Sequence, residues 1–187
     1  KQNSDDKVDD LKKQAWRRMY REAYRIVHNT ANPSVQMVWA GNVAGGSDER
    51  RYYWPGTDDS GNQMGDDYVD WVGMTWYPYD GGPKSLDDLS VFYSYYAKGH
   101  RHPMIFMETS ADGKGDTTSE LQLKTDHVTY LYSEETLKKY QNIKGIIWFN
   151  VIKGEDGMTK NFLLPDGRWD NHNQNSDKPG TLYSESN

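Results

Sequence analysis

The sequence SLDDLSVFYSYYAKGHRHPMIFME, residues 85–108, decides the fold because it contains a complete helix-to-strand unit. Ser85 is expected to cap a helix, and Asp88 completes a capping box at its start. Residues 103–108 then form an apolar run that meets its first charge at Glu108. An almost uninterrupted apolar run predicts a strand that is buried on both faces, as in a parallel sheet.

The same alternation of helix and strand extends over most of the chain. Helical periodicity marks a first helix up to about residue 30 and another over about residues 121–140, with room for a break in its middle. Further strands are predicted at residues 35–40, 69–75 and 145–150. Apolar strands that alternate with amphipathic helices predict an α/β fold, with a parallel sheet covered by helices.

The length limits the architecture to one main unit. A complete (β/α)8 barrel usually needs about 250 residues, and this chain has 187. We expect residues 1–150 to form the α/β unit. Residues 151–187 are expected to form a loop-rich tail that is weakly ordered beyond Trp169.

The composition excludes several kinds of function. The chain has no cysteine, which excludes disulfides and cysteine-ligated metals. Its formal net charge of −6 argues against nucleic acid as the main ligand, and it has no apolar run of about 18 residues that could span a membrane. Seven tryptophans and 14 tyrosines in a polar chain are typical of a secreted carbohydrate-active protein, and equally of a Tyr-rich globular domain.

The first helix has two predicted faces. Apolar residues at three- and four-residue steps predict a buried stripe, formed by Leu11, Ala15, Met19, Ala23, Ile26 and Val27 and widened by Trp16, Tyr20 and Tyr24. The basic residues of the helix are expected to form a solvated face, made up of Lys12, Lys13, Arg17, Arg18, Arg21 and Arg25.

Side chains suited to sugar binding gather at the predicted carboxyl ends of the strands, where parallel α/β proteins place their sites. They are Trp39 and Asn42, Trp76 and Tyr77, Glu108, and Trp148 and Asn150. Aromatic faces stack on sugar rings and amides bind hydroxyls, although each tryptophan could instead fill the core. A carboxylate that ends so apolar a strand needs a chemical task or a partner, such as a salt bridge at the sheet rim.

Two further groups of residues carry weaker signals. The acidic loop 57–67 contains the oxygen-bearing residues Asp58, Ser60, Asn62, Asp66 and Asp67. Such ligands could hold Ca²⁺, but the loop lacks the closing glutamate of an EF-hand, so we expect a solvated loop and no metal or other cofactor. Three histidines near helix ends or ahead of a strand are expected to cap helices or face solvent: His28, His100 and His102.

Five segments together resemble glycoside hydrolase family 26, the β-mannanase and β-1,3-xylanase type, and they occur in the family's order. They are AWRRMYREAYRIVHNTANPSVQMVWAGN (15–42), YYWPG (52–56), DDYVDWVGMTWY (66–77), HPMIFMETSA (102–111) and IKGIIWFN (143–150). The resemblance covers about residues 11–150. It implies the second half of a (β/α)8 barrel, strands five to eight, and retaining hydrolysis of mannan, xylan or β-glucan.

The resemblance also implies roles for the strand-end residues. Glu108 matches the nucleophile of the family. Trp39, Trp76, Tyr77 and Trp148 would then be sugar platforms, with Asn150 as a hydrogen-bonding support. We expect the three tryptophans to converge with Glu108 on one concave face, and Tyr77 to donate a hydrogen bond to Glu108.

One part of the family's pattern is missing from this sequence. The family's acid/base glutamate ends strand four, just ahead of the helix with which this sequence begins. The acid/base would therefore come from outside this chain, through an amino-terminal half-barrel partner or self-association, and the isolated chain is expected to be inactive. The alternative is a non-catalytic carbohydrate-binding or structural subunit that keeps half of a hydrolase barrel.

Overall fold

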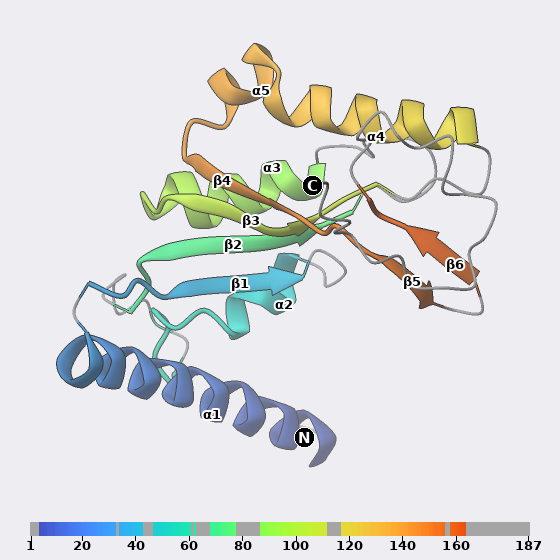
Figure 1. Cartoon of the computed structure of the whole chain (residues 1–187). Helices are drawn as coiled ribbons and strands as arrows, with labels where there is room; N and C mark the ends of the chain where they lie inside the picture. The colour runs from blue at the N-terminus through green and yellow to red at the C-terminus, as the bar shows by residue number, and fades with distance from the viewer. Residues whose placement is uncertain are drawn as a thin grey trace, which may run out of the picture.

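A four-stranded parallel sheet forms the centre of the molecule. The computed structural model describes residues 4–32, 34–42, 47–60, 62, 68–77, 87–111, 117–155 and 158–163 (Figure 1). The strands lie side by side in chain order: β1 (Val38–Asn42), β2 (Trp71–Trp76), β3 (Met104–Thr109) and β4 (Ile143–Trp148). The α/β fold expected from the sequence is confirmed, and all three strand pairs are parallel.

Helices connect the strands. They are α1 (Ser4–Ile26), continued by the wider π-helical turns η1 (Val27–Ala31); α2 (Ser47–Tyr52); α3 (Asp87–Phe92), continued by η2 (Tyr93–Gly99); α4 (Thr117–Tyr132); and α5 (Glu134–Lys139). The expected break in the last helix lies at Ser133, whose Oγ accepts a hydrogen bond from the Thr136 backbone N–H at 3.1 Å. The expected cap Ser85 lies outside the described residues.

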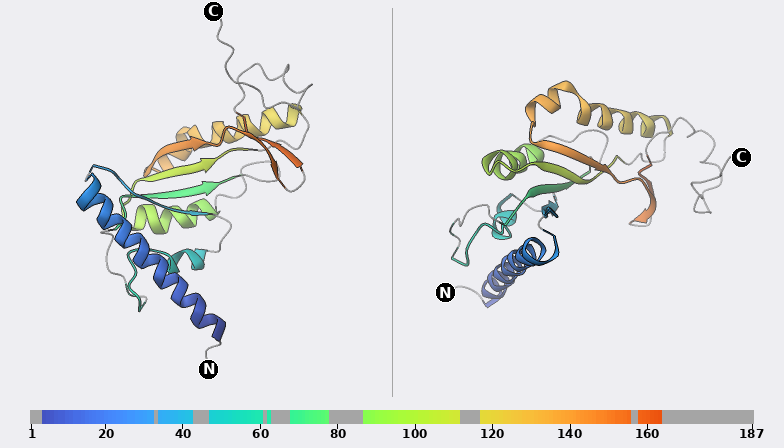
Figure 2. Two further views of the ribbon diagram at one scale, coloured as in Figure 1. Left: turned by 60° about the horizontal axis from the view of Figure 1, so that its bottom comes forward. Right: turned by 60° about the vertical axis from the view of Figure 1, so that its left-hand side comes forward.

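One face of the sheet carries the hydrophobic core. We call it the helix face, because helices α3 and α4 pack against it (Figures 1 and 2). Alternate residues of β2 and β3 are fully buried there: Val72, Met74, Met104 and Phe106. Because successive side chains of a strand point to opposite faces, the residues between them lie on the other face, which we call the inner face.

The inner face is more open and carries small residues. A Cβ on Gly73 would lie 2.7 Å from Met107 Cγ, and a Cβ on Gly145 would lie 3.0 Å from Ile105 Cδ1, so Met107 and Ile105 cover these glycines. Ala40 is exposed on this face, and the Ile147 side chain is 46% exposed. Among the described elements, α3 and α4 therefore cover the helix face of the sheet, while the inner face carries small and partly exposed residues.

Helix α1 packs through only part of the stripe that the sequence predicts: Tyr20 is buried in the core and Trp16 packs against it, while three of the aliphatic positions are exposed. Leu11, Met19 and Ile26 of the expected buried stripe are 63%, 60% and 53% exposed. Arg17 and Arg21, expected in solvent, are buried instead at 5% and 8% exposure. Their guanidinium groups satisfy backbone carbonyls of the loop that follows α2, and such carbonyls need donors when they are covered.

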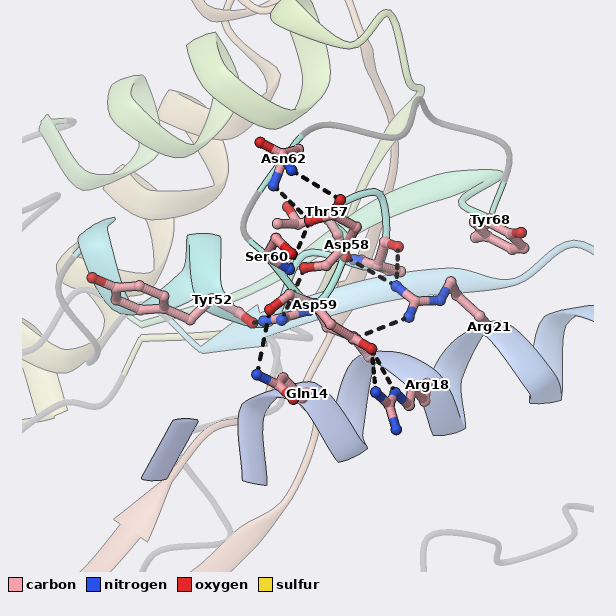
Figure 3. A network of polar contacts seen from close by, with 12 residues as sticks. Gln14, Arg18, Arg21, Tyr52, Thr57, Asp58, Asp59, Ser60, Asn62 and Tyr68 are labelled. Carbon is pink, nitrogen blue, oxygen red and sulfur yellow. Dashed lines mark hydrogen bonds and ion pairs between the residues drawn. The ribbon is translucent and has the colours of Figure 1, made fainter. Parts of the chain in front are cut away.

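Figure 3 shows how α1 holds this loop. Arg21 Nη1 donates to the carbonyls of Pro55 and Thr57 at 3.1 and 2.9 Å. Arg17 donates to Tyr52 O and Asp58 O, and Arg18 pairs with the Asp59 carboxylate. The Arg18 hydrogen bond is the main reason why the pKa of Asp59 lies below its ordinary value.

A β-hairpin lies in the region expected to be a loop-rich tail. Strands β5 (Ile152–Glu155) and β6 (Met158–Asn161) pair antiparallel. The following Phe162 is 1% exposed, and its carbonyl accepts hydrogen bonds from Trp148 Nε1 and Ser110 Oγ at 2.7 and 3.1 Å. The hairpin thus returns the chain to the carboxyl end of the sheet. The part of the tail beyond residue 163 lies outside the described residues.

Candidate functional site

A row of polar residues crosses the carboxyl end of the sheet. Asn42 of β1 pairs in register with Thr75 of β2, and Thr75 pairs with Glu108 of β3. Residues in register share a face of the sheet, so Thr75 and Glu108 lie on the inner face. Thr75 was not selected from the sequence, although its position at a strand end was the available signal. The backbone of Asn42 is placed, while its side chain lies outside the described part.

A bulge in β3 puts Glu108 on this face. Met74 pairs with Phe106, but the next residue of β2, Thr75, pairs with Glu108 and leaves Met107 extra. Strict alternation from Phe106 would have turned Glu108 toward the helix face. An extra residue reverses that direction, which is a common effect of bulges near functional sites.

The same bulge separates Glu108 from two of the tryptophans. Trp76 pairs with Thr109, and Thr109 pairs with Trp148. Because Glu108 immediately precedes Thr109, its side chain points away from theirs. Trp76 stacks on Phe106 at 5.8 Å between ring centroids, and it is 4% exposed. The expectation that the tryptophans converge with Glu108 on one face is therefore wrong for Trp76 and Trp148, which lie on the helix face.

Trp39 also lies in the core. It is 2% exposed, packs edge-on against Trp54 at 4.9 Å and lies parallel to Phe92 at 6.2 Å between ring centroids. Its Nε1 donates to the Tyr53 carbonyl at 3.2 Å. Trp39 thus joins β1 to α3, and its indole is not available as a sugar platform.

A buried histidine, His127 of α4, lies behind the strand ends. Thr109 Oγ1 donates to the Trp76 carbonyl at 2.6 Å and lies 2.8 Å from His127 Nε2. Since the hydroxyl hydrogen of Thr109 is used on the carbonyl, Nε2 of His127 is the donor to Thr109. The imidazole is fully buried between Trp76 and Trp148, and burial lowers its pKa to about 4. It is therefore neutral at pH 7 and fixes the end of β3 in place.

The remaining expected site residues lie near the hairpin. Tyr77 contacts the rings of Phe149 and Phe162 at 6.1 and 5.5 Å between centroids. Trp148 is half-buried with its Nε1 on Phe162 O, and Asn150 is exposed. That Tyr77 donates to Glu108 stays a prediction.

The Glu108 carboxylate is half-exposed at the rim of the inner face. Among the described residues it has neither a hydrogen bond nor an ion pair, so the salt bridge considered from the sequence is not formed there. An accessible carboxylate held on a strand can act as a nucleophile, as a general base or as a hydrogen-bond acceptor for hydroxyls.

In the acidic loop 57–67, the Asp58 carboxylate accepts hydrogen bonds from within the loop. Asp58 Oδ1 accepts from the backbone N–H groups of Ser60 and Asn62 at 2.8 and 2.7 Å, and Oδ2 accepts from Asn62 Nδ2 at 3.0 Å. The candidate calcium ligands Asp66 and Asp67 lie outside the described residues. Within the described part, no cluster of three or more His, Asp or Glu residues could hold a metal.

Histidines at the amino end of the sheet have partners. His28 Nε2 lies 3.1 Å from Asp70 Oδ2, and its Nδ1 lies 3.0 Å from the Tyr24 carbonyl of the preceding helical turn. His100 and His102 lie 4.9 and 5.9 Å from the Trp54 ring between centroids, and His102 is only 8% exposed. The expectation of a capping or solvent role is thus wrong for His102, which lines the core.

No protein-family model matches the chain, and no curated protein matches it either. Among solved structures, an engineered protein has a TM-score of 0.51 and 16% identity over 74% of this chain and 30% of that chain. A glycoside hydrolase family 26 β-mannanase from Bacteroides ovatus has a TM-score of 0.48 and 14% identity over 72% of this chain and 34% of that chain.

A third similar structure, a family 128 (subgroup II) endo-β-1,3-glucanase from Sorangium cellulosum, has a TM-score of 0.45 and 17% identity over 78% of this chain and 59% of that chain. The chain spans about a third of the length of the engineered protein and of the mannanase. The likeness to the engineered protein concerns the fold alone, an α/β arrangement consistent with part of a barrel. Within the described residues, no helix is long and apolar enough to cross a membrane.

Proposed function

We propose that this chain is the nucleophile-bearing part of a retaining glycoside hydrolase that acts on a β-linked polysaccharide. The observation that carries the proposal is the position of Glu108. It is an accessible carboxylate at the carboxyl end of a central parallel strand, turned by a bulge onto the inner face. Sites of parallel α/β proteins gather at that end of the sheet.

The segments that resemble family 26 add to this support, because the residue that matches the family's nucleophile is the one found on the inner face. The β-mannanase and the endo-β-1,3-glucanase named above act on β-glycans, as their names state. The resemblance to family 26 implies mannan, β-1,3-xylan and mixed-linkage β-glucan as the substrates to test.

The proposed reaction proceeds in two steps. A Glu108 carboxylate oxygen attacks the anomeric carbon, and the glycosidic oxygen leaves with a proton from a second carboxyl group. Water, deprotonated by that second group, then cleaves the glycosyl ester and regenerates Glu108. The second group has to lie about 5–5.5 Å from Glu108. In the described part of the four-stranded sheet, Glu108 is the one carboxylate at a strand end, so we propose that the second comes from outside these strands.

The neighbouring Thr75 would assist the first step. It lies beside Glu108 on the adjacent strand and on the same face. A hydroxyl there can donate a hydrogen bond either to the carboxylate or to a sugar hydroxyl. The burial of Trp39 and Trp76 removes two of the expected sugar platforms, both for a hydrolase and for the alternative of a non-catalytic carbohydrate-binding or structural subunit.

Covalent trapping tests the proposal directly. The protein with its complete barrel is incubated with 2-deoxy-2-fluoro β-mannosyl, β-xylosyl and β-glucosyl inactivators, and its peptides are analysed by mass spectrometry. One of the three should label Glu108, and Glu108→Gln should lose both the label and hydrolysis while keeping its melting temperature. Thr75→Ser is the matched control that should keep the label. Label on another residue, or hydrolysis that survives Glu108→Gln, would contradict the assignment.

A further inference from the structure

The bulge in β3 exists relative to both neighbouring strands. The stretch Phe106–Thr109 of β3 lies opposite Met74–Trp76 of β2 and opposite Ile146–Trp148 of β4. Three steps along β3 therefore match two steps along each neighbour. Bulges are rare between parallel strands, so this one needs specific contacts that stabilise it.

Both ends of the bulge are fixed on the helix face. Phe106 and Thr109 are fully buried there, and the Thr109 hydroxyl lies 2.8 Å from His127 Nε2. Two residues lie between these fixed ends, and strict alternation would place only one of them on the inner face. Because both ends stay on the helix face, Met107 and Glu108 both lie on the inner face.

Two consecutive side chains on one face need extra room. Glu108 occupies the place beside Thr75 in register, so the Met107 side chain leans back over Gly73. A Cβ on Gly73 would lie 2.7 Å from Met107 Cγ, and two carbon atoms do not approach so closely. Since Cγ lies next to the backbone, Met107 cannot avoid the contact by moving the far end of its side chain. Any side chain at position 73 would therefore displace Met107.

The remaining inner-face residue of β3 leaves the space over Gly73 to Met107. Ile105 pairs with Gly73 in register, but its side chain leans toward β4, where a Cβ on Gly145 would lie 3.0 Å from Ile105 Cδ1. On the other side, Val38 Cγ1 of β1 would lie 2.8 Å from a Cβ on Gly73. The space is thus bounded by β1 and filled from β3.

A side chain at position 73 would move β3 rather than β1. Strands β1 and β2 keep their register from Val38 to Asn42, whereas the register of β2 and β3 shifts at the bulge. An interrupted ladder yields more easily than a continuous one. Without room over Gly73, Met107 would take the place beside Thr75, and Glu108 would turn to the helix face.

We propose that Gly73 is a positioning residue for Glu108. It gives Met107 the space on the inner face that allows Glu108 to lie on that face as well. This inference rests on the proposed function, in which Glu108 is the nucleophile. Its test measures where the carboxylate lies and not whether it reacts with a sugar, so the two proposals succeed or fail separately.

Labelling of carboxyl groups in the 187-residue chain tests this role. The chain is treated with a water-soluble carbodiimide and glycine ethyl ester, and mass spectrometry gives the labelling rate of Glu108 relative to Glu135, which is exposed on α5. Gly73→Ala should slow the labelling of Glu108 about tenfold, because a side chain turned to the helix face meets the packed core. Gly41→Ala is the matched control that should keep the rate, since the nearest side-chain atom to a Cβ there is at an ordinary 3.4 Å.

Two double variants identify the neighbour through which Gly73 acts. Gly73→Ala with Met107→Ala removes the crowded Cγ on the β3 side and should restore the wild-type labelling rate of Glu108. Gly73→Ala with Val38→Ala relieves only the β1 side and should stay slow. Unchanged labelling in Gly73→Ala, restoration by Val38→Ala, or no restoration by Met107→Ala would each overturn the proposal.

Thermal melts establish that each variant is folded before it is labelled. If Gly73→Ala alone does not fold, the double variant with Met107→Ala should fold and label Glu108 at the wild-type rate, and the one with Val38→Ala should not. Any other result for this pair overturns the proposal. Failure of the sugar inactivators to label Glu108 would contradict the proposed function and leave the carbodiimide pattern unchanged.

Discussion

At the scale of single residues, the hydrogen bond between His127 and Thr109 is a polar contact buried among the aromatic rings of Trp76 and Trp148. It joins α4 to the carbonyl of Trp76 through one hydroxyl group. A buried imidazole without a carboxylate beside it is stable only as the neutral form, because the charged form loses its hydration. The histidine therefore makes folding sensitive to acid.

The pH dependence of the free energy of unfolding should reveal the titration of His127. Its pKa is about 4 in the folded chain and about 6.5 when exposed, so the unfolded chain binds the proton first. The stabilising contribution is complete above pH 6.5 and is lost as the pH falls from 6.5 to about 4, and it amounts to about 3 kcal/mol.

Thermal melts of the wild type and His127→Gln measure this effect. The wild type should lose stability steeply between pH 6.5 and pH 4, and the variant should be less stable at pH 7 but flatter across that window. Equal slopes in the two proteins would show that other groups cause the acid sensitivity.

The sequence was sufficient to select Glu108 as a candidate site residue, but not to predict the face of the sheet on which each tryptophan lies. Glu108 stood out because it ends an apolar strand, and that signal depends only on composition. The face of each side chain depends on the parity of its position, and one extra residue at Met107 reverses that parity. Nothing local in residues 103–108 marks the bulge, since Gly73, which leaves space for Met107, lies on another strand.

At the scale of elements, α1 illustrates a second limit of sequence reasoning. That this segment forms a helix was predictable, because helical periodicity marks a helix whatever it packs against. Which face is buried depends on the partner. The partner here is a loop whose backbone carbonyls accept from Arg17 and Arg21. The helix therefore buries this side together with Tyr20 and leaves Leu11, Met19 and Ile26 exposed.

The arginine contacts should account for the docking of α1. Arg21→Ala should lower the free energy of unfolding by about 2–3 kcal/mol, because it leaves the carbonyls of Pro55 and Thr57 without their charged donor. Arg18→Ala is the matched control in the same helix. Arg18 is 64% exposed, so its pair with Asp59 is screened by solvent and its loss should change the free energy of unfolding much less.

Urea denaturation of the two variants measures the difference. Equal losses would mean that the loop is held by something other than the buried guanidinium. Arg21→Lys should not restore full stability, since a single ammonium cannot reproduce the fixed geometry of the guanidinium donors.

At the scale of the whole molecule, the described helices α3 and α4 cover one face of the four-stranded sheet, and among the described residues β1 pairs with β2 alone. In the described sheet, Glu108 is the one carboxylate at the carboxyl end of a strand, and it lies on the inner face. The sequence predicted the four strands and their order, because apolar runs and helical periods recur in chain order. It missed the hairpin β5–β6, whose short polar strands carry no comparable pattern.

The isolated 187-residue chain should not hydrolyse mannan, β-1,3-xylan or mixed-linkage β-glucan. Retaining hydrolysis needs two carboxyl groups held rigidly, and loss of one of two cooperating groups costs several orders of magnitude in rate. The other candidate acids, Asp80, Asp112 and Asp116, lie outside the described residues. Reducing-sugar release by the purified chain, checked by mass spectrometry to contain no longer species, is the measurement.

Hydrolysis that disappears in Asp80→Asn, Asp112→Asn or Asp116→Asn would place the second acid within this chain and contradict an outside acid/base. No hydrolysis by the chain, together with hydrolysis by the complete protein that is lost in Glu108→Gln, is the expected outcome, because the open inner face then holds only half of the catalytic pair.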